Sequence, residues 1–118
     1  KIYKNSSSPK SYTYIQNDNK QLIILEGLFD LLTLVTLDEG LLKSSDSIVL
    51  NSIAFIKDVE SFINNYEIVL LYLDNDTAGM HATKYLLDKY TNAIDKSAIY
   101  KIYKDLNEFI CNEKGKIS

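Results

Sequence analysis

Acidic side chains follow two short apolar runs of this 118-residue sequence at the points where the runs end. Glu26 comes directly after the run 21–25, and Asp74 and Asp76 come directly after the run 67–73. Carboxylate oxygens gathered around one point bind Mg²⁺ or Mn²⁺, because hard cations prefer oxygen ligands and take phosphate oxygens as further ligands. The chemistry that these residues indicate is therefore metal-assisted phosphoryl transfer.

The Asp-x-Asp spacing adds detail to this interpretation. On an extended backbone residues i and i+2 point the same way, so Asp74 and Asp76 can face one metal ion while Asn75 turns away. Two carboxylates about 4 Å apart repel by roughly 4 kcal/mol at an effective dielectric near 20, so either a proton or a cation must lie between them. Asp76 also has a purely structural reading, as the N-cap of a helix that starts at Thr77. The sequence leaves both readings open.

Apolar runs and helical periodicities alternate along the chain and predict where these acids lie. The expected strands are 21–25, 47–50, 67–73 and 98–103, and the expected helices are 28–37, 57–64, 77–90 and 106–112. Continuously apolar strands separated by helices predict an α/β fold, a compact Rossmann-like parallel four-stranded sheet with helices on both faces. All strands of such a sheet end at the same edge, so Glu26, Asp74 and Asp76 are expected to meet there.

Two further groups of polar residues belong to the same edge. The end of the fourth expected strand is followed by Lys104, Asp105, Asn107 and Glu108. Asp30 lies four residues after Glu26, where it either favours the dipole of the first helical turn or steadies Glu26. We regard Asp30, Lys104, Asn107 and Glu108 as supporting candidates.

At these residues the chain resembles a TOPRIM domain, the module found in topoisomerases, bacterial primases, OLD-type nucleases and RecR-like repair proteins. The resemblance covers about 21–112 and rests on three segments in order. The strand ending in Glu26-Gly27 is similar to the first TOPRIM motif. Asp74-Asn75-Asp76, followed by Ala78-Gly79, is similar to the Asp-x-Asp motif of primase-type members, and 104–110 resembles a later primase segment.

The resemblance implies a fold and roles for the site residues. Glu26 would be the general acid/base of nucleotidyl transfer or strand cleavage. Asp74 and Asp76 would ligate Mg²⁺ (or Mn²⁺), and Asp105 would be an accessory ligand, with Asn107 where a second acid is often found. The chain looks closest to primase-like TOPRIM domains of mobile-element proteins, which implies Mg²⁺-dependent transfer on nucleic acid by a DNA primase-like protein. An OLD- or RecR-like module of DNA cleavage or repair, or a non-catalytic binding module, is the alternative.

Two other classes of enzyme or regulator share part of the pattern. The nucleophile motif of haloacid-dehalogenase-type phosphatases, an apolar strand followed by D-x-D-x-T, is matched by the residues from Leu71 to Thr77. That motif normally opens its fold, and Glu26 would have no role in it. A receiver domain needs an acidic pair after its first strand, which Glu26-Gly27 does not supply.

Composition sets the remaining expectations. Hydrophobic residues make up 46% and charged residues 25%, as in soluble single domains. The formal net charge is −3, and all 13 basic residues are lysine. Because arginine is the preferred residue for bidentate phosphate recognition, weak binding of DNA by this chain alone is expected, with other domains of a parent protein helping.

The ends of the chain and its single thiol complete the prediction. Residues 1–20 are polar and include Ser6-Ser7-Ser8-Pro9, so they are expected to form a linker or flexible lead-in, with the domain at 21–118. The chain starts with Lys1 and is expected to be a piece of a longer protein. Cys111 is the only cysteine, which suits a reducing, cytoplasmic setting, and no apolar run is long enough to span a membrane.

Overall fold

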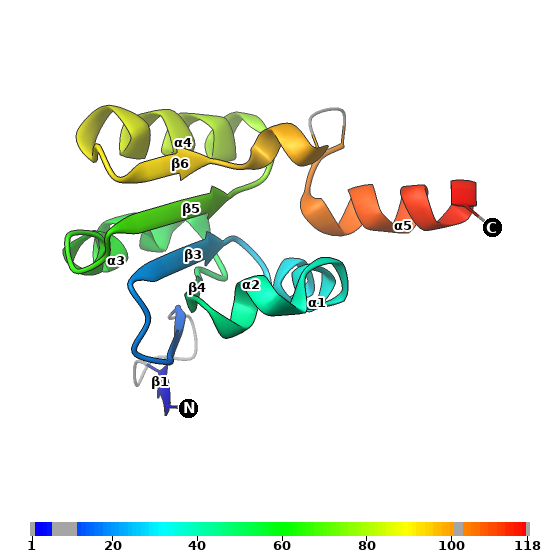
Figure 1. Cartoon of the computed structure of the whole chain (residues 1–118). Coiled ribbons are helices and arrows are strands. Elements are labelled where there is room, and N and C mark those ends of the chain that lie inside the picture. Colours follow the sequence, from blue (N-terminus) through cyan, green and yellow to red (C-terminus); the bar gives the residue numbers. More distant parts are fainter. Residues whose placement is uncertain (1, 6–11, 101–102, 118) are drawn as a thin grey trace.

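The computed structural model describes residues 2–5, 12–100 and 103–117, which form a mixed sheet with helices on both faces (Figure 1). In chain order the six strands are β1 (Ile2–Asn5), β2 (Thr13–Gln16), β3 (Gln21–Leu25), β4 (Asp46–Val49), β5 (Ile68–Tyr72) and β6 (Ala93–Asp95). They are arranged in the order β1-β2-β4-β3-β5-β6. The four strands β4, β3, β5 and β6 run parallel, which confirms the predicted parallel core. β2 runs antiparallel to both of its neighbours, β1 and β4.

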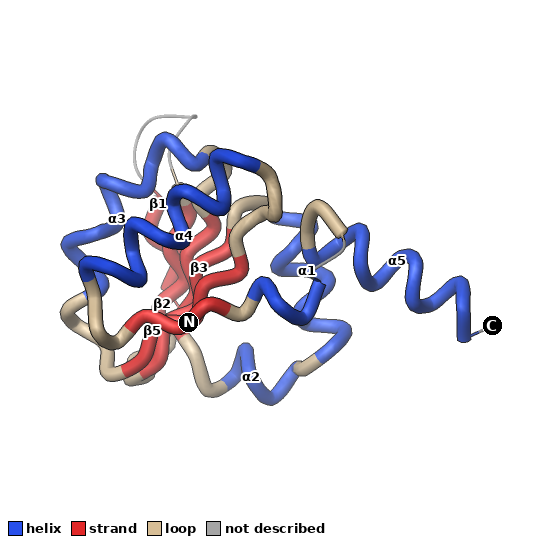
Figure 2. The backbone as a smooth tube through the Cα atoms, turned by 90° about the horizontal axis from the view of Figure 1, so that it is seen from above, coloured by secondary structure: helices blue, strands red, loops and turns tan. Residues whose placement is uncertain are grey.

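The described part of the chain also contains five α-helices and two 3₁₀ turns. They are α1 (Leu28–Leu37), α2 (Glu39–Lys43), η1 (Ile53–Phe55), α3 (Ile56–Ile63), α4 (Thr77–Lys89), η2 (Ser97–Tyr100) and α5 (Leu106–Ile117). Of these, η2 and α5 follow the last strand. Seen from above, α3 and α4 cover one face of the sheet while α1 and α2 lie on the other (Figure 2). α5 packs against α1 and extends beyond the sheet. Within the described part of the chain, no helix has both the length and the apolar character needed to cross a membrane.

The central strand β3 shows why these runs are apolar throughout. Leu22 and Ile24 belong to the core beneath α3 and α4, whereas Ile23 and Leu25 belong to the core beneath α1. All four side chains are fully buried. A strand with helices on both faces has no solvent side, so its sequence loses the polar alternation of a half-exposed strand.

The fourth parallel strand is not where the sequence analysis placed it. The expected strand 98–103 is wrong: β6 occupies Ala93–Asp95, and the following residues form η2, with residues 101 and 102 outside the described part. The Asn92 side chain donates hydrogen bonds to the carbonyls of Ile63 and Tyr66, at 3.0 and 2.9 Å. These bonds fix the chain beside β5 directly after α4, before the more apolar segment is reached.

The apolar residues of η2 have a different role from that of a strand. Tyr100 is buried on the α1 side of the sheet, and its hydroxyl donates to the carbonyl of Leu73 at 2.7 Å. Ile99 stays 44% exposed. The apolar pattern that predicted a strand here is therefore explained largely by one buried aromatic residue, Tyr100, in a 3₁₀ turn.

The polar segment expected as a lead-in contributes β1 and β2 to the sheet. Tyr14 of β2 is buried, and its hydroxyl is hydrogen-bonded to that of Tyr66. Tyr66 in turn donates to the buried carboxylate of Asp46 at 2.6 Å, and this carboxylate also accepts the N–H groups of Asn17 and Asn19. This network attaches β2 and the turn after it to the start of β4.

The helices are less buried than their apolar content suggested. In α1, Leu32, Val35 and Leu37 are exposed. Asp38 caps α2, and Gly40 lies inside that helix. In α4 the buried line is Gly79, Thr83 and Leu86, at spacings i, i+4 and i+7. Met80, Tyr85 and Leu87 lie beside that line and are exposed.

Candidate metal centre

The carboxyl ends of β3 and β5 lie side by side, because Leu25 pairs with Tyr72 in the parallel ladder. Glu26 leaves the first strand, and Asp74 and Asp76 leave the second. One carboxylate oxygen from each of these three acids lies within 4.8 Å of the others. The structure therefore places together the three acids that the sequence expected to meet.

Two local features let α4 begin beside this cluster. Asp76 is the N-cap of α4, and its Oδ1 accepts the N–H of Gly79 at 2.8 Å. A Cβ atom at Gly79 would lie 2.1 Å from the carbonyl oxygen of Asp74, so only glycine allows this first turn to approach the end of β5 so closely. The structural reading of Asp76 as an N-cap holds, and the same residue also belongs to the acidic cluster.

Asn75, between the two aspartates, points elsewhere, as its spacing predicted. Its Nδ2 donates to the carbonyls of Tyr100 and Tyr103 at 2.8 and 2.9 Å. Its backbone N–H donates to the carbonyl of Lys104 at 2.5 Å. Asn75 thus ties the connection between η2 and α5 to the end of β5, which brings the Asp105 segment to the same edge.

Burial and like charges dominate the electrostatics of the cluster. Burial, a hydrogen bond to Asp74 and the negative charges of Asp74, Asp76 and Asp30 raise the pKa of Glu26 to about 9. Without a cation, Glu26 is thus protonated at neutral pH. The Oδ1 atom of Asp74 is buried and has no hydrogen-bond partner among the described residues. Such an atom is costly to bury unless it is paired, and a divalent cation held by Asp74 and Asp76 would satisfy it.

A cavity of about 300 Å³ opens in front of the cluster. Its wall includes Glu26, Asp74, Asp105 and Asp30, together with the neutral side chains of Asn51, Ser52 and Asn107. Asp105 therefore faces the same space as the cluster, as expected for an accessory acid. Its Oδ1 also accepts the N–H of Glu108 at 2.8 Å, in the manner of a helix cap.

Asp30 connects this cavity to α5. Its carboxylate is buried and accepts the N–H of Gly27 at 3.3 Å and that of Asn107 at 3.2 Å. Burial raises the pKa of Asp30 to about 6; the bond from Asn107 opposes this shift and the nearby charge of Asp105 adds to it. Asn107 also accepts the hydroxyl of Thr33 at 2.9 Å. Asp30 and Asn107 together hold the start of α5 against α1.

The two remaining supporting candidates lie outside the cavity wall. Lys104 and Glu108 are exposed, and neither lines the cavity in front of the cluster. In contrast, Asn51 and Ser52, just after β4, line the cavity although they were not among the predicted site residues. Asn51 adopts a positive φ of 66° and donates its N–H to the carbonyl of Glu26 at 2.8 Å. The feature of the sequence that could have identified Asn51 is its place directly after an apolar strand.

A parallel α/β sheet with acids gathered at the ends of its central strands defines a Toprim-type domain. A family model described as Toprim-like matches residues 23–110, and the chain belongs to this family. The resemblance to TOPRIM domains predicted from the sequence is therefore confirmed. No curated protein matches the sequence.

Two solved structures of bacteriophage T7 proteins share the fold, each with a TM-score of 0.64 and 20% identity over 86% of this chain. One is the crystal structure of the primase fragment of the T7 primase-helicase protein. The other contains the T7 lagging-strand DNA polymerase interacting with the primase domains of two gp4 subunits bound to an RNA/DNA hybrid and dTTP. The chain covers 43% and 52% of these two structures' chains, so it spans about half of their length.

Proposed function

We propose that this chain is the catalytic domain of a DNA primase-like protein and takes part in Mg²⁺-dependent nucleotidyl transfer on nucleic acid. The observation that carries the proposal is the approach of Glu26, Asp74 and Asp76 to within 4.8 Å in a Toprim-like domain. The likeness to a primase fragment shows the fold, and it makes nucleotidyl transfer the activity to test first.

The residues present suit a divalent cation. Asp74 and Asp76 supply the ligands, and Asp105, which lines the same cavity without belonging to the three-acid cluster, is an accessory ligand. A bound Mg²⁺ or Mn²⁺ neutralises the repulsion between these carboxylates and offers its open positions to phosphate oxygens.

Glu26 is proposed as the general acid/base. Its raised pKa keeps a proton on the carboxyl at neutral pH when no cation is bound. A carboxyl in this state donates a proton to a leaving oxygen, and a nearby cation lowers its pKa so that the ionised form can accept a proton from an attacking hydroxyl. One residue can therefore serve either direction of transfer.

The other candidates are proposed to support this pair of functions. Asp30 and Asn107 position the start of α5, and with it the side of the cavity that carries Asp105. Lys104 and Glu108, exposed next to Asp105, are proposed to meet the substrate outside the cavity.

Nucleic acid is the proposed partner, with help from other domains of a parent protein. The chain has a net charge of −3 and no arginine. A phosphate backbone is held mainly by basic side chains, so we expect the isolated chain to bind DNA weakly. Tight, salt-resistant binding by these 118 residues would contradict this part of the proposal.

The dehalogenase-type alternative gives Glu26 no role, whereas Glu26 is hydrogen-bonded to Asp74 and belongs to the cluster. The non-catalytic alternative is tested in the parent protein with Glu26→Gln. We expect this change to keep metal binding and to abolish primer synthesis or nicking. Retained activity would exclude Glu26 as the acid/base.

Thermal denaturation with and without Mg²⁺ or Mn²⁺ tests the metal centre itself. A ligand at about 100 times its Kd stabilises the folded state by about 2.7 kcal/mol, and we expect a rise in Tm for the unaltered chain. Asp74→Ala should remove most of that rise. Asp58→Ala, at an exposed aspartate in the first turn of α3, should keep it. Equal metal stabilisation of the Asp74→Ala and Asp58→Ala chains would reject the site.

A further inference from the structure

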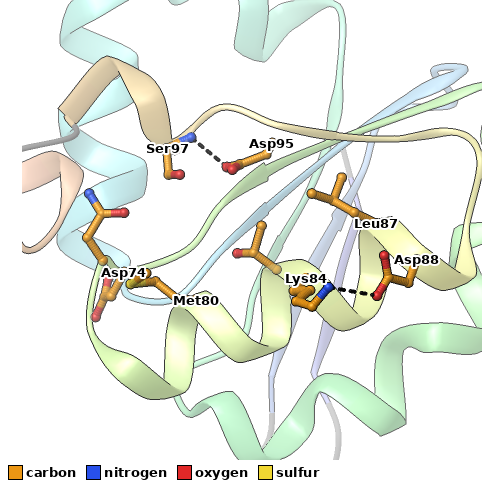
Figure 3. A pocket seen from close by; sticks show the side chains of 9 residues that line it. Asp74, Met80, Lys84, Leu87, Asp88, Asp95 and Ser97 are labelled. Carbon is orange, nitrogen blue, oxygen red and sulfur yellow. Dashed lines mark hydrogen bonds and ion pairs between the residues drawn. The ribbon is translucent and has the colours of Figure 1, made fainter.

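A second cavity, of about 390 Å³, lies between α4 and the segment from β6 to η2 (Figure 3). We call it the α4–β6 cavity; its wall includes Asp74, Met80, Lys84, Leu87, Asp95 and Ser97. Asp74 also lines the cavity of the candidate metal centre, so the two spaces meet at the end of β5. The volume is within the range of small-molecule sites, about 300–1,000 Å³.

One wall of the α4–β6 cavity is apolar and comes from α4. Met80 and Leu87, seven residues apart on the helix, are 57% and 38% exposed. Neither belongs to the line of α4 that packs on the sheet. Lys84 lies between them along the helix, and its aliphatic stem continues the apolar surface. A wall of this kind suits the flat face of a nucleobase.

The opposite wall is polar and comes from the end of β6. Asp95 accepts the backbone N–H of Ser97 at 2.8 Å, which fixes the orientation of its carboxylate (Figure 3). A carboxylate can accept further hydrogen bonds beyond this one. Sugar hydroxyls and exocyclic amino groups are donors of the matching kind, and a carboxylate bonded to ribose hydroxyls is a familiar arrangement in nucleotide-binding α/β folds.

Charge decides which part of a nucleotide fits. Asp74, Asp88 and Asp95 surround the cavity, and Lys84 is paired with Asp88 at 3.5 Å. Phosphate groups are repelled from such a space, except at its Asp74 end, where a cation in the metal centre offsets the carboxylates. A nucleic-acid strand would place one phosphate per residue along this acidic wall, whereas a single nucleotide keeps all its phosphates at one end.

We propose that the α4–β6 cavity holds the nucleoside of one incoming nucleotide. The base lies against Met80 and Leu87, the sugar is directed towards Asp95, and the phosphates extend past Asp74 to the metal centre. This inference rests on the proposed function, because the phosphates require the cation there.

Isothermal titration of the chain with ATP in the presence of Mg²⁺ tests the proposal. Burying a leucine side chain stabilises by about 1.5–3 kcal/mol, so Leu87→Glu should weaken ATP binding by about tenfold or more. Leu32→Glu is the matched control, because Leu32 is an exposed leucine of α1 that does not line this cavity. Inorganic tripolyphosphate should bind the unaltered chain and the Leu87→Glu chain alike. Met80→Glu, on the same wall, should repeat the effect if the Leu87→Glu chain fails to fold.

The outcomes separate this inference from the proposed metal centre. If Mg²⁺ alone raises Tm but ATP binds no better than tripolyphosphate, the nucleoside pocket is wrong while the metal centre stands. Equal ATP affinities for the Leu87→Glu and Leu32→Glu chains also overturn the pocket. If a single-stranded oligonucleotide displaces ATP and is itself weakened by Leu87→Glu, the cavity holds a strand rather than one nucleotide. If Mg²⁺ gives no rise in Tm, the proposed function fails. In that case the pocket would still be supported if adenosine binds the unaltered chain but not the Leu87→Glu chain.

Discussion

Glu26→Gln is expected to change how the stability of the metal-free chain depends on pH. The pKa of Glu26 rises from an ordinary 4.5 to about 9 in the folded chain, first through burial and then through Asp74. Between these two values the folded chain binds a proton that the unfolded chain has released. The free energy of unfolding therefore falls as pH rises through this window, and the contribution of Glu26 is lost as pH passes the folded pKa. Glutamine keeps the shape and the hydrogen-bonding capacity of the protonated acid but cannot ionise.

The magnitude follows from the linkage relation. While the folded carboxyl stays protonated, the unfolding free energy falls by about 1.4 kcal/mol per pH unit. Between about pH 7 and 9 this amounts to a little over 2 kcal/mol, because Glu26 is about half ionised at the upper limit. Glu26 is only partly buried, and solvent screens part of this penalty, so we expect a decline of about 1–2 kcal/mol. Asp30, with a pKa of about 6, titrates mostly below about pH 7 and so contributes little between about pH 7 and 9. Ionisable groups that do not interact with Glu26 are common to both proteins and cancel in their difference.

Urea denaturation in EDTA-containing buffer, followed by circular dichroism, measures this decline. The unaltered chain should lose stability from about pH 7 to 9, the chain carrying Glu26→Gln should not show this loss, and the two should differ most at the alkaline end. Saturating Mg²⁺ should flatten the curve of the unaltered chain, because a cation favours the ionised acid. Glu67→Gln, at an exposed glutamate, controls for the loss of one charge. Parallel curves for the unaltered and Glu26→Gln chains would refute the electrostatic account of the cluster.

Three further changes test the packing that holds the site. Gly79→Ala should cost about 3 kcal/mol in urea denaturation, because its Cβ would meet the backbone of Asp74; a loss below about 1 kcal/mol would contradict that contact. Asp46→Ala should lower the free energy of unfolding by about 3 kcal/mol, because the hydroxyl of Tyr66 and two N–H groups lose their buried acceptor. Stabilisation by Mg²⁺ should persist in this variant. Loss of that stabilisation would show that the network reaches the site. Asp30→Ala, which removes the acceptor of the Asn107 N–H, should speed hydrogen exchange at the start of α5; unchanged exchange would exclude Asp30 as its anchor.

The parallel core and the approach of the acids could be predicted because both follow from the short apolar runs in the sequence. The runs that became β3 and β5 are buried on both sides, so their apolar content alone indicates central strands. Parallel neighbours end at one edge, and this fixes the approach of Glu26 to Asp74 without knowledge of any side-chain contact. The buried unpaired oxygen of Asp74 depends on the packing of both loops, and no sequence pattern carries it.

The fourth strand was misplaced because contacts far apart in the chain decide its position. Asn92 reads as a polar helix end, yet its amide holds the carbonyls of Ile63 and Tyr66 and brings the next three residues into the sheet. Tyr100 reads as a strand aromatic, yet its hydroxyl bonds the carbonyl of Leu73 from a 3₁₀ turn. Local propensity could not reveal either bond, because each joins residues more than 25 positions apart.

The sequence alone could not tell whether an acid caps a helix or belongs to the site, because both roles place an aspartate at the start of a helix that follows a strand. Asp30, Asp76 and Asp105 each accept a backbone N–H in the first turn or at the cap of a helix, in α1, α4 and α5 respectively. Each of these helices begins beside the cavity, and its N-terminal dipole offsets part of the negative charge gathered there. A carboxylate that caps a helix at the carboxyl edge of a parallel sheet still has oxygen lone pairs for a cation. The caps therefore help the chain to fold although the acids of the cluster repel one another. Removing a cap should lower the free energy of unfolding even in the absence of a metal ion.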